Sequence, residues 1–340
     1  MKMLVLGGTA YLSKKTAETA IAQGWDVTVA ARGESGEPPR GAEFLRVDRS
    51  EPDGLDALGD REFDVIVDVS RIPLHVKRAV EALADRTRHW VFVSSISVYN
   101  DYATLNDSLH DPAPDDRGEV TPETYGPDKV ACENLVRDRL GDRSAVLRAG
   151  LIVGPGDPND RLGYWTLRTA EGGPMLAPGR PGRPVQWIDV ADLADWILRV
   201  GEKGTSGTYD AIGPVVSMAE FLETVRSAMP SSKQAVSVWA DADFLTEKGV
   251  NHWAGPDSLP LWLPDDYTFM LMRPFGPAKD AGLRTRSLAE TVLSWWKGYL
   301  DNPDVRLAAG LTREKEGAVL GALLQRNRTW EVPAPKTGKE

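Results

Sequence analysis

The sequence is poor in the residues that build disulfides and metal centres. Its 340 residues include one cysteine, Cys132, and four histidines. A single thiol can form neither an internal disulfide nor a multi-thiolate metal site, which fits a reducing compartment such as the cytoplasm. We expect no metal, because metal-ligand spacing such as H-x-x-x-H is lacking among the histidines, which are His75, His89, His110 and His252.

The sequence also lacks a long apolar run and an excess of positive charge. No apolar stretch approaches the roughly 20 residues that a membrane-spanning helix needs, so no membrane partner is expected. Lys plus Arg number 40 against 50 Asp plus Glu, a net charge of −10, which argues against a nucleic acid as the main partner. With 41% hydrophobic residues, the chain can bury a sizeable core, and its length favours two domains over one.

The first 150 residues alternate short apolar runs with amphipathic stretches. The apolar runs predict buried strands of a parallel sheet, and the amphipathic stretches predict the helices that connect them. The fold class is therefore α/β, a doubly wound, Rossmann-like sheet whose ligands bind beyond the carboxyl ends of the strands. Strands are expected at Met3–Leu6, Asp26–Ala30, Glu43–Val47, Val65–Val69, Trp90–Val93 and Ser144–Leu147, and helices at Leu12–Ala22, Pro73–Ala84 and Pro122–Leu140.

The loop between the first strand and the first helix is rich in small residues. Dinucleotide-binding loops use three spaced glycines for the turn, for close approach of the pyrophosphate and for helix packing, and the helix amides bind the phosphates. Here Gly7 keeps the first glycine, while Ala10 and Ser13 replace the other two. The alternative is a strand, turn and helix without a nucleotide. The residues expected to bind the cofactor are Gly7, Gly8, Thr9, Ala10, Tyr11 and Leu12.

A basic residue, Arg32, follows the second strand. An acidic residue at this place suits the ribose 2′-hydroxyl of NAD, whereas an arginine suits the 2′-phosphate of NADP. Arg32 therefore favours NADP, with NAD as the alternative; a solvated loop arginine is the non-functional interpretation. Asp48 and Arg49, after the third strand, are expected near the adenine ring. The alternative is that they are simply polar residues of a turn. Lys14, Lys15 and Lys129 add positive charge for a phosphorylated cofactor.

The second half of the chain is rich in glycine and proline turns. Within it, Val190–Val200 and Thr208–Ile212 predict a helix and a strand that return to the first sheet. We expect a nucleotide-binding domain over residues 1–155, rejoined by 185–212, and a substrate-binding cap over 156–184 and 213–330. Helices are predicted at Ser217–Ala228, Ser287–Leu300 and 313–328, a frayed tail at Pro333–Glu340, and tryptophans for a pocket or a core at Trp165, Trp187, Trp253 and Trp262.

Tyr125 and Lys129 form a Y-x-x-x-K pair at the start of a predicted helix. Residues four apart share a helix face, and an ammonium beside the phenol favours the phenolate that an acid/base for hydride transfer needs. The same lysine can hold the ribose of a nicotinamide. Tyr11 and Lys15 repeat the pattern inside the phosphate loop, where it is coincidental. At the end of the fifth strand, the Ser94–Ser97 hydroxyls can bind a substrate oxygen or cap the strand.

These segments resemble extended or atypical short-chain dehydrogenases/reductases of the NAD-dependent epimerase/dehydratase family. The resemblance implies that Ser95 is the catalytic hydroxyl, Tyr125 the acid/base and Lys129 its partner. It further implies a cofactor cleft lined by Asp68, Val69, Ser70 and Ser94. It covers about the first 215 residues and rests on Leu6–Thr9, Val93–Tyr99, Tyr125–Lys129, Arg148–Gly156 and Trp187–Ala194.

One departure from the family concerns the substrate. Nucleotide-sugar epimerases commonly carry an arginine for the substrate diphosphate where this chain has Val185. The valine favours a smaller or more apolar molecule.

Three functions stay open from the sequence. The first, which the Ser/Tyr/Lys set favours, is an NADP-dependent oxidoreductase acting on a ketone or a secondary alcohol of a small molecule. The second is an epimerase or dehydratase with tightly bound NAD and a sugar-like substrate. The third is a non-catalytic dinucleotide-sensing or RNA-binding protein on the same fold. A monomer and a homodimer are both compatible with the sequence.

Overall fold

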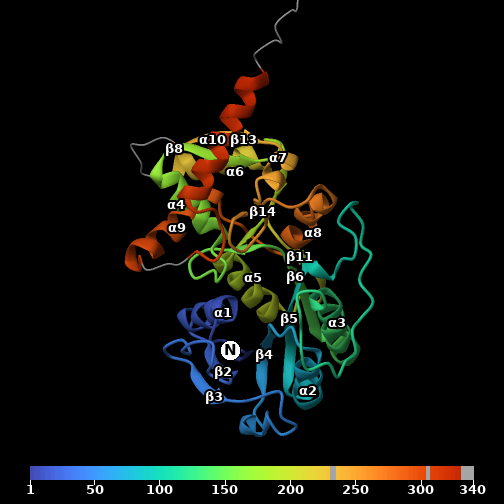
Figure 1. The fold of residues 1–340 in the computed structure, drawn as a ribbon. Coiled ribbons are helices and arrows are strands. Elements are labelled where there is room, and N and C mark those ends of the chain that lie inside the picture. Colours follow the sequence, from blue (N-terminus) through green and yellow to red (C-terminus); the bar gives the residue numbers. More distant parts are fainter. Residues whose placement is uncertain (230–234, 304–306, 331–340) are drawn as a thin grey trace, which may run out of the picture. The chain divides into compact units, whose positions relative to one another are not determined.

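The computed structural model describes residues 1–229, 235–303 and 307–330 and divides the chain into two compact units (Figure 1). Unit 1 comprises Met1–Asp157, Gln186–Val215 and Asp265–Ser287. Unit 2 comprises Pro158–Val185, Val216–Pro264 and Leu288–Glu340. The tail expected at Pro333–Glu340 lies outside the described residues.

Unit 1 is built on a seven-stranded parallel sheet of order β11-β6-β5-β4-β1-β2-β3. The chain starts in the middle of the sheet and fills the two sides in turn, so β1 lies between β2 and β4. Such a reversal of direction opens a crevice at the carboxyl ends of the strands. The strands are β1 (Lys2–Leu6), β2 (Asp26–Ala31), β3 (Glu43–Arg46), β4 (Phe63–Asp68), β5 (Thr87–Ser95), β6 (Ser144–Ala149) and β11 (Gly207–Ala211).

Helices cover both faces of this sheet, which is why its strands are apolar throughout. In β1, Met3 and Val5 pack with α1 (Tyr11–Ala22) and α5 (Val190–Lys203), while Leu4 and Leu6 face α2 and α3. The expected fold class is thereby confirmed. The remaining elements of unit 1 are α2 (Pro73–Leu83), α3 (Tyr125–Leu140), α8 (Gly276–Asp280) and the pair β7 (Ile152–Val153) and β10 (Ile188–Asp189).

Two differences from the expected boundaries bear on the site. Helix α3 begins at Tyr125 rather than at Pro122, because the Thr124 hydroxyl accepts a hydrogen bond from the Thr121 N–H and closes a turn there. Residues 265–287, assigned above to the cap, pack within unit 1. The Gln186 side chain binds both the N–H and the C=O of Arg273 and ties this segment to the sheet domain.

Unit 2 combines helices with a short parallel pair, β8 (Gly173–Pro178) and β13 (Ala235–Ala240). A buried ion pair joins α4 to α10, since Arg168 Nε lies 2.7 Å from Glu316 Oε2. Among the described residues, no helix is long and apolar enough to cross a membrane. The other elements are α4 (Arg161–Glu171), α6 (Met218–Ala228), α7 (Ala242–Glu247), α9 (Leu288–Asp301), α10 (Arg313–Trp330), β9 (Pro184–Val185), β12 (Val216–Ser217), β14 (Asn251–His252) and β15 (Ser258–Leu259).

The four tryptophans considered above have different environments. Trp165 and Trp262 are fully buried in unit 2, which makes them core residues. Trp187 belongs to unit 1, outside the predicted cap. Trp253 is half-buried, and the guanidinium of Arg161 lies 5.0 Å from the centre of its ring.

A buried ion pair joins α3 to the sheet of unit 1. Glu133 is 0% exposed, and both of its oxygens accept from Arg148 on β6, at 2.9 and 2.8 Å. Burial alone would raise the pKa of the Glu133 carboxyl, but the hydrogen bonds and charge of Arg148 lower it below its ordinary value. A fully buried carboxylate held in this way fixes the position of α3 on the sheet.

Removing the charge at this pair should destabilise the protein strongly. We expect Glu133→Gln to lower the free energy of unfolding by about 3–5 kcal/mol, because an unpaired Arg148 would stay buried. Asp85→Asn is the matched control, since Asp85 pairs with Arg139 at the surface and should cost under about 1 kcal/mol. Urea unfolding of both variants checks this, and equal losses would contradict it.

Candidate active site at the carboxyl ends of the sheet

The phosphate loop adopts a backbone that requires glycine. Gly7 and Gly8 have φ of 121° and 89°, a region that side chains disfavour. A Cβ on Gly8 would also lie 2.8 Å from both methyl groups of Val29. No side chain caps α1, whose N-cap residue is Ala10, so the N-terminus of the helix can bind an anion through its amides.

Ser13 stands where the third glycine of a dinucleotide loop would be. Its hydroxyl donates to the Ala10 carbonyl at 2.8 Å, and its side chain is only 6% exposed. The small serine therefore preserves the loop conformation and occupies little of the space beside it. The loss of the second and third glycines leaves the strand, turn and helix geometry intact.

A cavity of about 290 Å³ lies against this loop. Its walls come from the phosphate loop and from the ends of β2, β3 and β4, so the structure brings together the segments that the sequence singled out. Lys14 and Lys15 do not line it. The lining residues are Gly7, Gly8, Thr9, Ala10, Ser13, Ala30, Ala31, Arg32, Gly33, Glu34, Ser35, Val47, Asp48, Arg49, Val69, Arg71, Ile72 and His75.

Several predicted cofactor residues lie outside this lining. Leu12 packs into the core, and Tyr11 opens α1 with a positive φ of 33°. Asp68 is 0% exposed and instead holds Arg49, whose Nη1 lies 3.1 and 3.0 Å from its two oxygens. The hydroxyl of Ser70 accepts from the Ile72 N–H. Asp68 and Ser70 thus support the cavity wall from behind.

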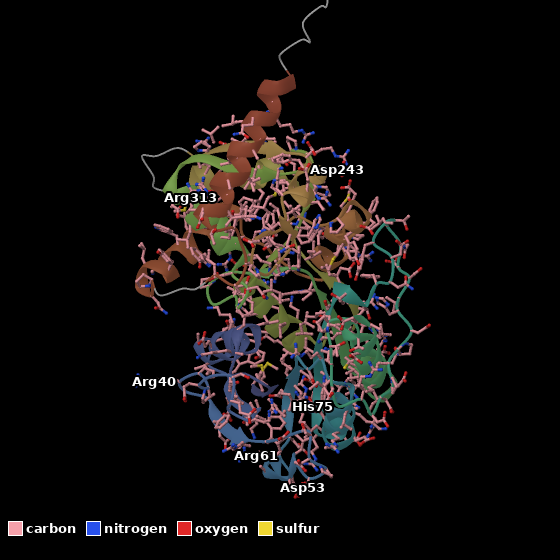
Figure 2. The ribbon with its side chains drawn as sticks, in the orientation of Figure 1. Arg40, Asp53, Arg61, His75, Asp243 and Arg313 are labelled. Atoms are coloured by element: carbon pink, nitrogen blue, oxygen red, sulfur yellow. The ribbon has the colours of Figure 1, made fainter. Side chains whose placement is uncertain are left out.

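His75, in the first turn of α2, contributes a neutral ring to the cavity (Figure 2). Its Nε2 lies 3.0 Å from the Ser50 hydroxyl. Burial, reinforced by the charge of Arg49, lowers the pKa of His75 from 6.5 to about 4. Nearby, a hydrogen bond from the Ser50 N–H lowers the pKa of Asp48.

The serines after β5 have separate tasks. The Ser94 hydroxyl donates to Glu133 at 2.6 Å and is turned toward α3, so it does not face the cofactor cavity as predicted. The Ser95 hydroxyl accepts from the Ser97 N–H and donates to the Ser97 hydroxyl, both at 3.1 Å. Ser95 therefore caps the turn that follows the strand and keeps one lone pair for another donor.

Lys129 joins α3 to the ends of two strands. Its Nζ donates to the carbonyls of Ser70 at 2.7 Å and Val93 at 2.6 Å, and the side chain is 3% exposed. An ammonium has three donors, so one remains for a ligand. These contacts fix the helix on which Tyr125 lies.

Tyr125 is the first residue of α3 and lies close to the serine turn. A Cβ on the adjacent Gly126 would come within 2.4 Å of the Ser97 carbonyl, so only glycine permits this approach. Tyr125 is half-buried, and within the described residues its hydroxyl has no hydrogen-bond partner. The first turn of α3 thus lies against the turn that contains Ser95 and Ser97.

A second tyrosine of this region, Tyr99, is engaged on all sides. Its hydroxyl donates to Asp210 at 2.7 Å and accepts from Arg148 at 3.0 Å, and Arg273 lies 3.6 Å from the ring centre. Burial raises the pKa of Tyr99 to about 12. Tyr99 is thus a structural residue and not a candidate acid/base.

Sequence reasoning missed Arg273 and Asp210. Arg273 is 5% exposed and binds Asp210, Asp107 and the Asn106 carbonyl, which joins the segment after β5 to β11. Its partners lie 63 to 167 residues away in the chain, and no local motif marks it. The acidic stretch Asp111–Glu119 is likewise held, since Asp115 pairs with Lys77 and Arg117 with Asp128.

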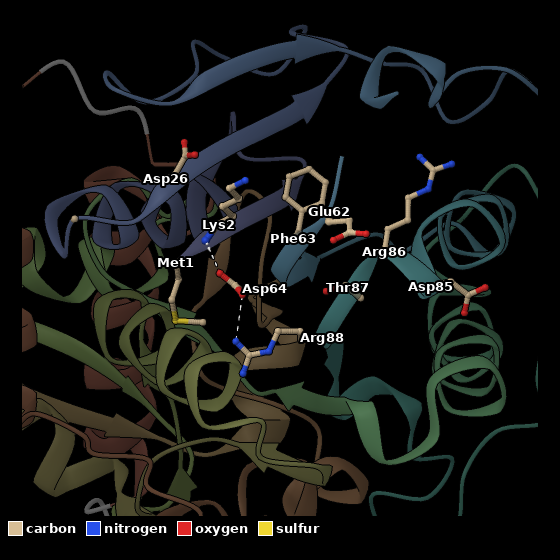
Figure 3. Close-up of a pocket in the computed structure, with 11 residues that line it drawn as sticks. Met1, Lys2, Asp26, Glu62, Phe63, Asp64, Asp85, Arg86, Thr87 and Arg88 are labelled. Atoms are coloured by element: carbon tan, nitrogen blue, oxygen red, sulfur yellow. Dashed lines mark hydrogen bonds and ion pairs between the residues drawn. The ribbon is translucent and has the colours of Figure 1, made fainter. Parts of the chain in front are cut away.

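A more open hollow of about 670 Å³ lies at the opposite, amino ends of the strands (Figure 3). Its charged groups pair with each other, as Asp64 accepts from the Lys2 N–H and from Arg88. None of the candidate site residues lies there.

Comparison with known proteins gives the family of the chain. The sequence model of the NAD-dependent epimerase/dehydratase family matches residues 3–212. The chain belongs to this family. It is therefore an enzyme of the short-chain dehydrogenase/reductase type. No protein of curated function matches the sequence.

Three solved structures illustrate the similarity of fold, all at low sequence identity. WbmH of Bordetella bronchiseptica, in complex with NAD⁺, has a TM-score of 0.62 at 16% identity over 88% of this chain and 98% of its own. UDP-N-acetylglucosamine 4-epimerase of Bacillus cereus has a TM-score of 0.62 at 16% identity, and the match covers 90% of this chain and 98% of its own. UDP-glucose 4-epimerase of Thermus thermophilus, complexed with NAD, has a TM-score of 0.61 at 18% identity, and the match covers 89% of this chain and 100% of its own. They establish the fold alone.

The half-buried, neutral His75 predicts a loss of stability in mild acid. Because the unfolded chain binds a proton near pH 6.5 and the folded one only near pH 4, stability present above pH 6.5 is lost as the pH falls toward 4. His75→Asn should lose less free energy of unfolding than the wild type over this range. Urea unfolding at several pH values measures it, and an NMR titration of His75 with a midpoint near 6.5 would contradict it.

Proposed function

We propose that the chain is an NAD(P)-dependent oxidoreductase that interconverts a carbonyl and a secondary alcohol on a small molecule. The observation that supports this proposal is the contact between Gly126 and the Ser97 carbonyl, which sets the first turn of α3, with Tyr125, against the turn that Ser95 caps. Ser95, Tyr125 and Lys129 are the proposed catalytic residues.

The phosphate-loop cavity fits the adenosine half of a nicotinamide dinucleotide. The glycine backbone and the uncapped α1 N-terminus suit a pyrophosphate, and Arg32, Asp48, Arg49 and Val69 surround the space beside it. Arg32 can bind a 2′-phosphate, which favours NADP, with NAD as the alternative. When bound, the nicotinamide would supply or accept the hydride.

The residues of this chain would then handle the proton and the oxygen. Ser95 hydrogen-bonds the substrate oxygen, and Tyr125 gives a proton to that oxygen in reduction or takes it in oxidation. The free donor of Lys129 can hold a ribose hydroxyl, while its other two donors keep α3 in place. The turn between Ser95 and Ser97 keeps the serine hydroxyl fixed.

We assign recognition of the rest of the substrate to unit 2. Val185 belongs to that unit and is 0% exposed. It is uncharged, whereas nucleotide-sugar epimerases commonly carry an arginine at the corresponding position. This favours a smaller or more apolar molecule than a nucleotide sugar.

A second candidate function is epimerisation or dehydration with tightly held NAD. Family membership favours it, and two proteins of similar fold are named as UDP-sugar 4-epimerases. It uses the same three residues, so the discriminating result is cofactor that copurifies and shows no net change of redox state during turnover. The third candidate, a sensing or RNA-binding protein, leaves the free Tyr125 hydroxyl unexplained.

Loss of the Tyr125 hydroxyl should abolish turnover and leave the fold intact. We expect Tyr125→Phe to lower kcat by about 10²–10⁴-fold, the usual contribution of a positioned acid/base, while NADPH affinity changes less than about twofold. The assay is NADPH oxidation with a panel of carbonyl compounds. Tyr209→Phe is the control, because the Tyr209 hydroxyl binds only the Ser206 carbonyl; full activity of Tyr125→Phe would refute the mechanism.

A further inference from the structure

We infer that Glu34 is a specificity-determining residue that opposes binding of a 2′-phosphate at Arg32. This inference rests on the proposed function, since it concerns the same dinucleotide site. The two residues face each other at the end of β2, where Arg32 Nε lies 3.3 Å from Glu34 Oε2. The guanidinium proposed to bind the cofactor phosphate is therefore already paired with a carboxylate.

The segment that carries this pair is fixed at both ends. It begins at the end of β2, and at its other end Gly36 lies against the phosphate loop. A Cβ on Gly36 would be 2.6 Å from the Thr9 carbonyl, and φ there is +145°. Glu34 therefore pairs with Arg32 and also lines the cavity beside the phosphate loop.

A second hollow next to the pair offers room for a phosphate. It measures about 350 Å³ and shares Arg32, Glu34, Val47 and Asp48 with the first cavity. Arg46 also lines it, since β2 and β3 run in register with Ala31 beside Arg46. Arg46 is thus a second cation for the same phosphate.

The charge around the second hollow is nevertheless negative. Its lining contains two arginines and four carboxylates, which are Glu34, Asp48, Glu51 and Asp53. Glu34 is the one paired with Arg32, and a bound 2′-phosphate would have to replace it on that guanidinium. Both side chains are about half exposed, at 51% and 59%, and exposed ion pairs contribute little to stability. The exchange is therefore possible, and the remaining carboxylate charge limits its gain.

The consequence is a site that accepts both cofactors. NAD binds with the Arg32–Glu34 pair intact, and NADP binds when its phosphate takes over Arg32. Neutralising Glu34 should turn this balanced site into one that prefers the 2′-phosphate. From Arg32 alone one would expect a strong preference for NADP. The ion pair with Glu34, seen only in the structure, is the reason to expect a balanced site.

Two fragments that lack the nicotinamide test this directly. The affinities of adenosine 2′,5′-bisphosphate and adenosine 5′-diphosphate, measured by calorimetry, are compared for the wild type, Glu34→Gln and Arg32→Gln. Asp53→Asn is the matched control, because Asp53 lines the same hollow and is not paired with Arg32. All of these side chains are exposed, so the variants should fold.

We expect Glu34→Gln to raise the preference for the 2′,5′-bisphosphate about threefold to tenfold, by removing one negative charge at contact distance. Arg32→Gln should lower it at least about tenfold, and Asp53→Asn should change it less than about twofold. An unchanged preference in Glu34→Gln, or a weaker affinity of that variant for the 5′-diphosphate, would overturn the inference; the latter would show that Glu34 binds the ribose hydroxyl. If neither fragment binds the wild type, the proposed function itself fails.

Discussion

The site depends on one buried cation. Lys129 is 3% exposed, and removing an ammonium from water is costly unless strong hydrogen bonds replace the solvent. The carbonyls at the ends of β4 and β5 provide them, at 2.7 and 2.6 Å. Because only one position of α3 satisfies both carbonyls, the helix cannot slide along the sheet. Tyr125, one turn earlier, is thereby held beside the serine turn, and the Glu133–Arg148 pair secures the next turn of the same helix.

The phosphate loop shows how much of a dinucleotide motif can change while its geometry survives. Gly7 and Gly8 supply the left-handed backbone that only glycine adopts easily. At Ala10 and Ser13 the backbone can accept a side chain, so a methyl group and a hydroxymethyl group are tolerated. The Ser13 hydroxyl even adds a hydrogen bond within the loop. The number of glycines is therefore a poorer guide to function than the two positions where glycine is required.

The sheet, its helices and the phosphate loop could be predicted because each follows from a local pattern of apolar residues and glycines. The side-chain contacts at the site could not be predicted in this way. Ser94 and Ser95 look equivalent in the sequence, but neighbouring residues of a strand point to opposite faces. The Ser94 hydroxyl therefore points toward α3, where it donates to Glu133. Arg273 went unnoticed because its partners lie far away in the chain. Glu34 belongs to no motif, and only the folded chain shows that it pairs with Arg32.

A crystal structure of the protein grown with NADP would show whether the dinucleotide binds at the carboxyl ends of the sheet. We expect the pyrophosphate on the amides that follow Gly7, the adenosine beside His75 and Asp48, and the nicotinamide directed toward Tyr125. A dinucleotide bound in the hollow at the amino ends of the strands, or one with its nicotinamide turned away from Tyr125, would contradict it.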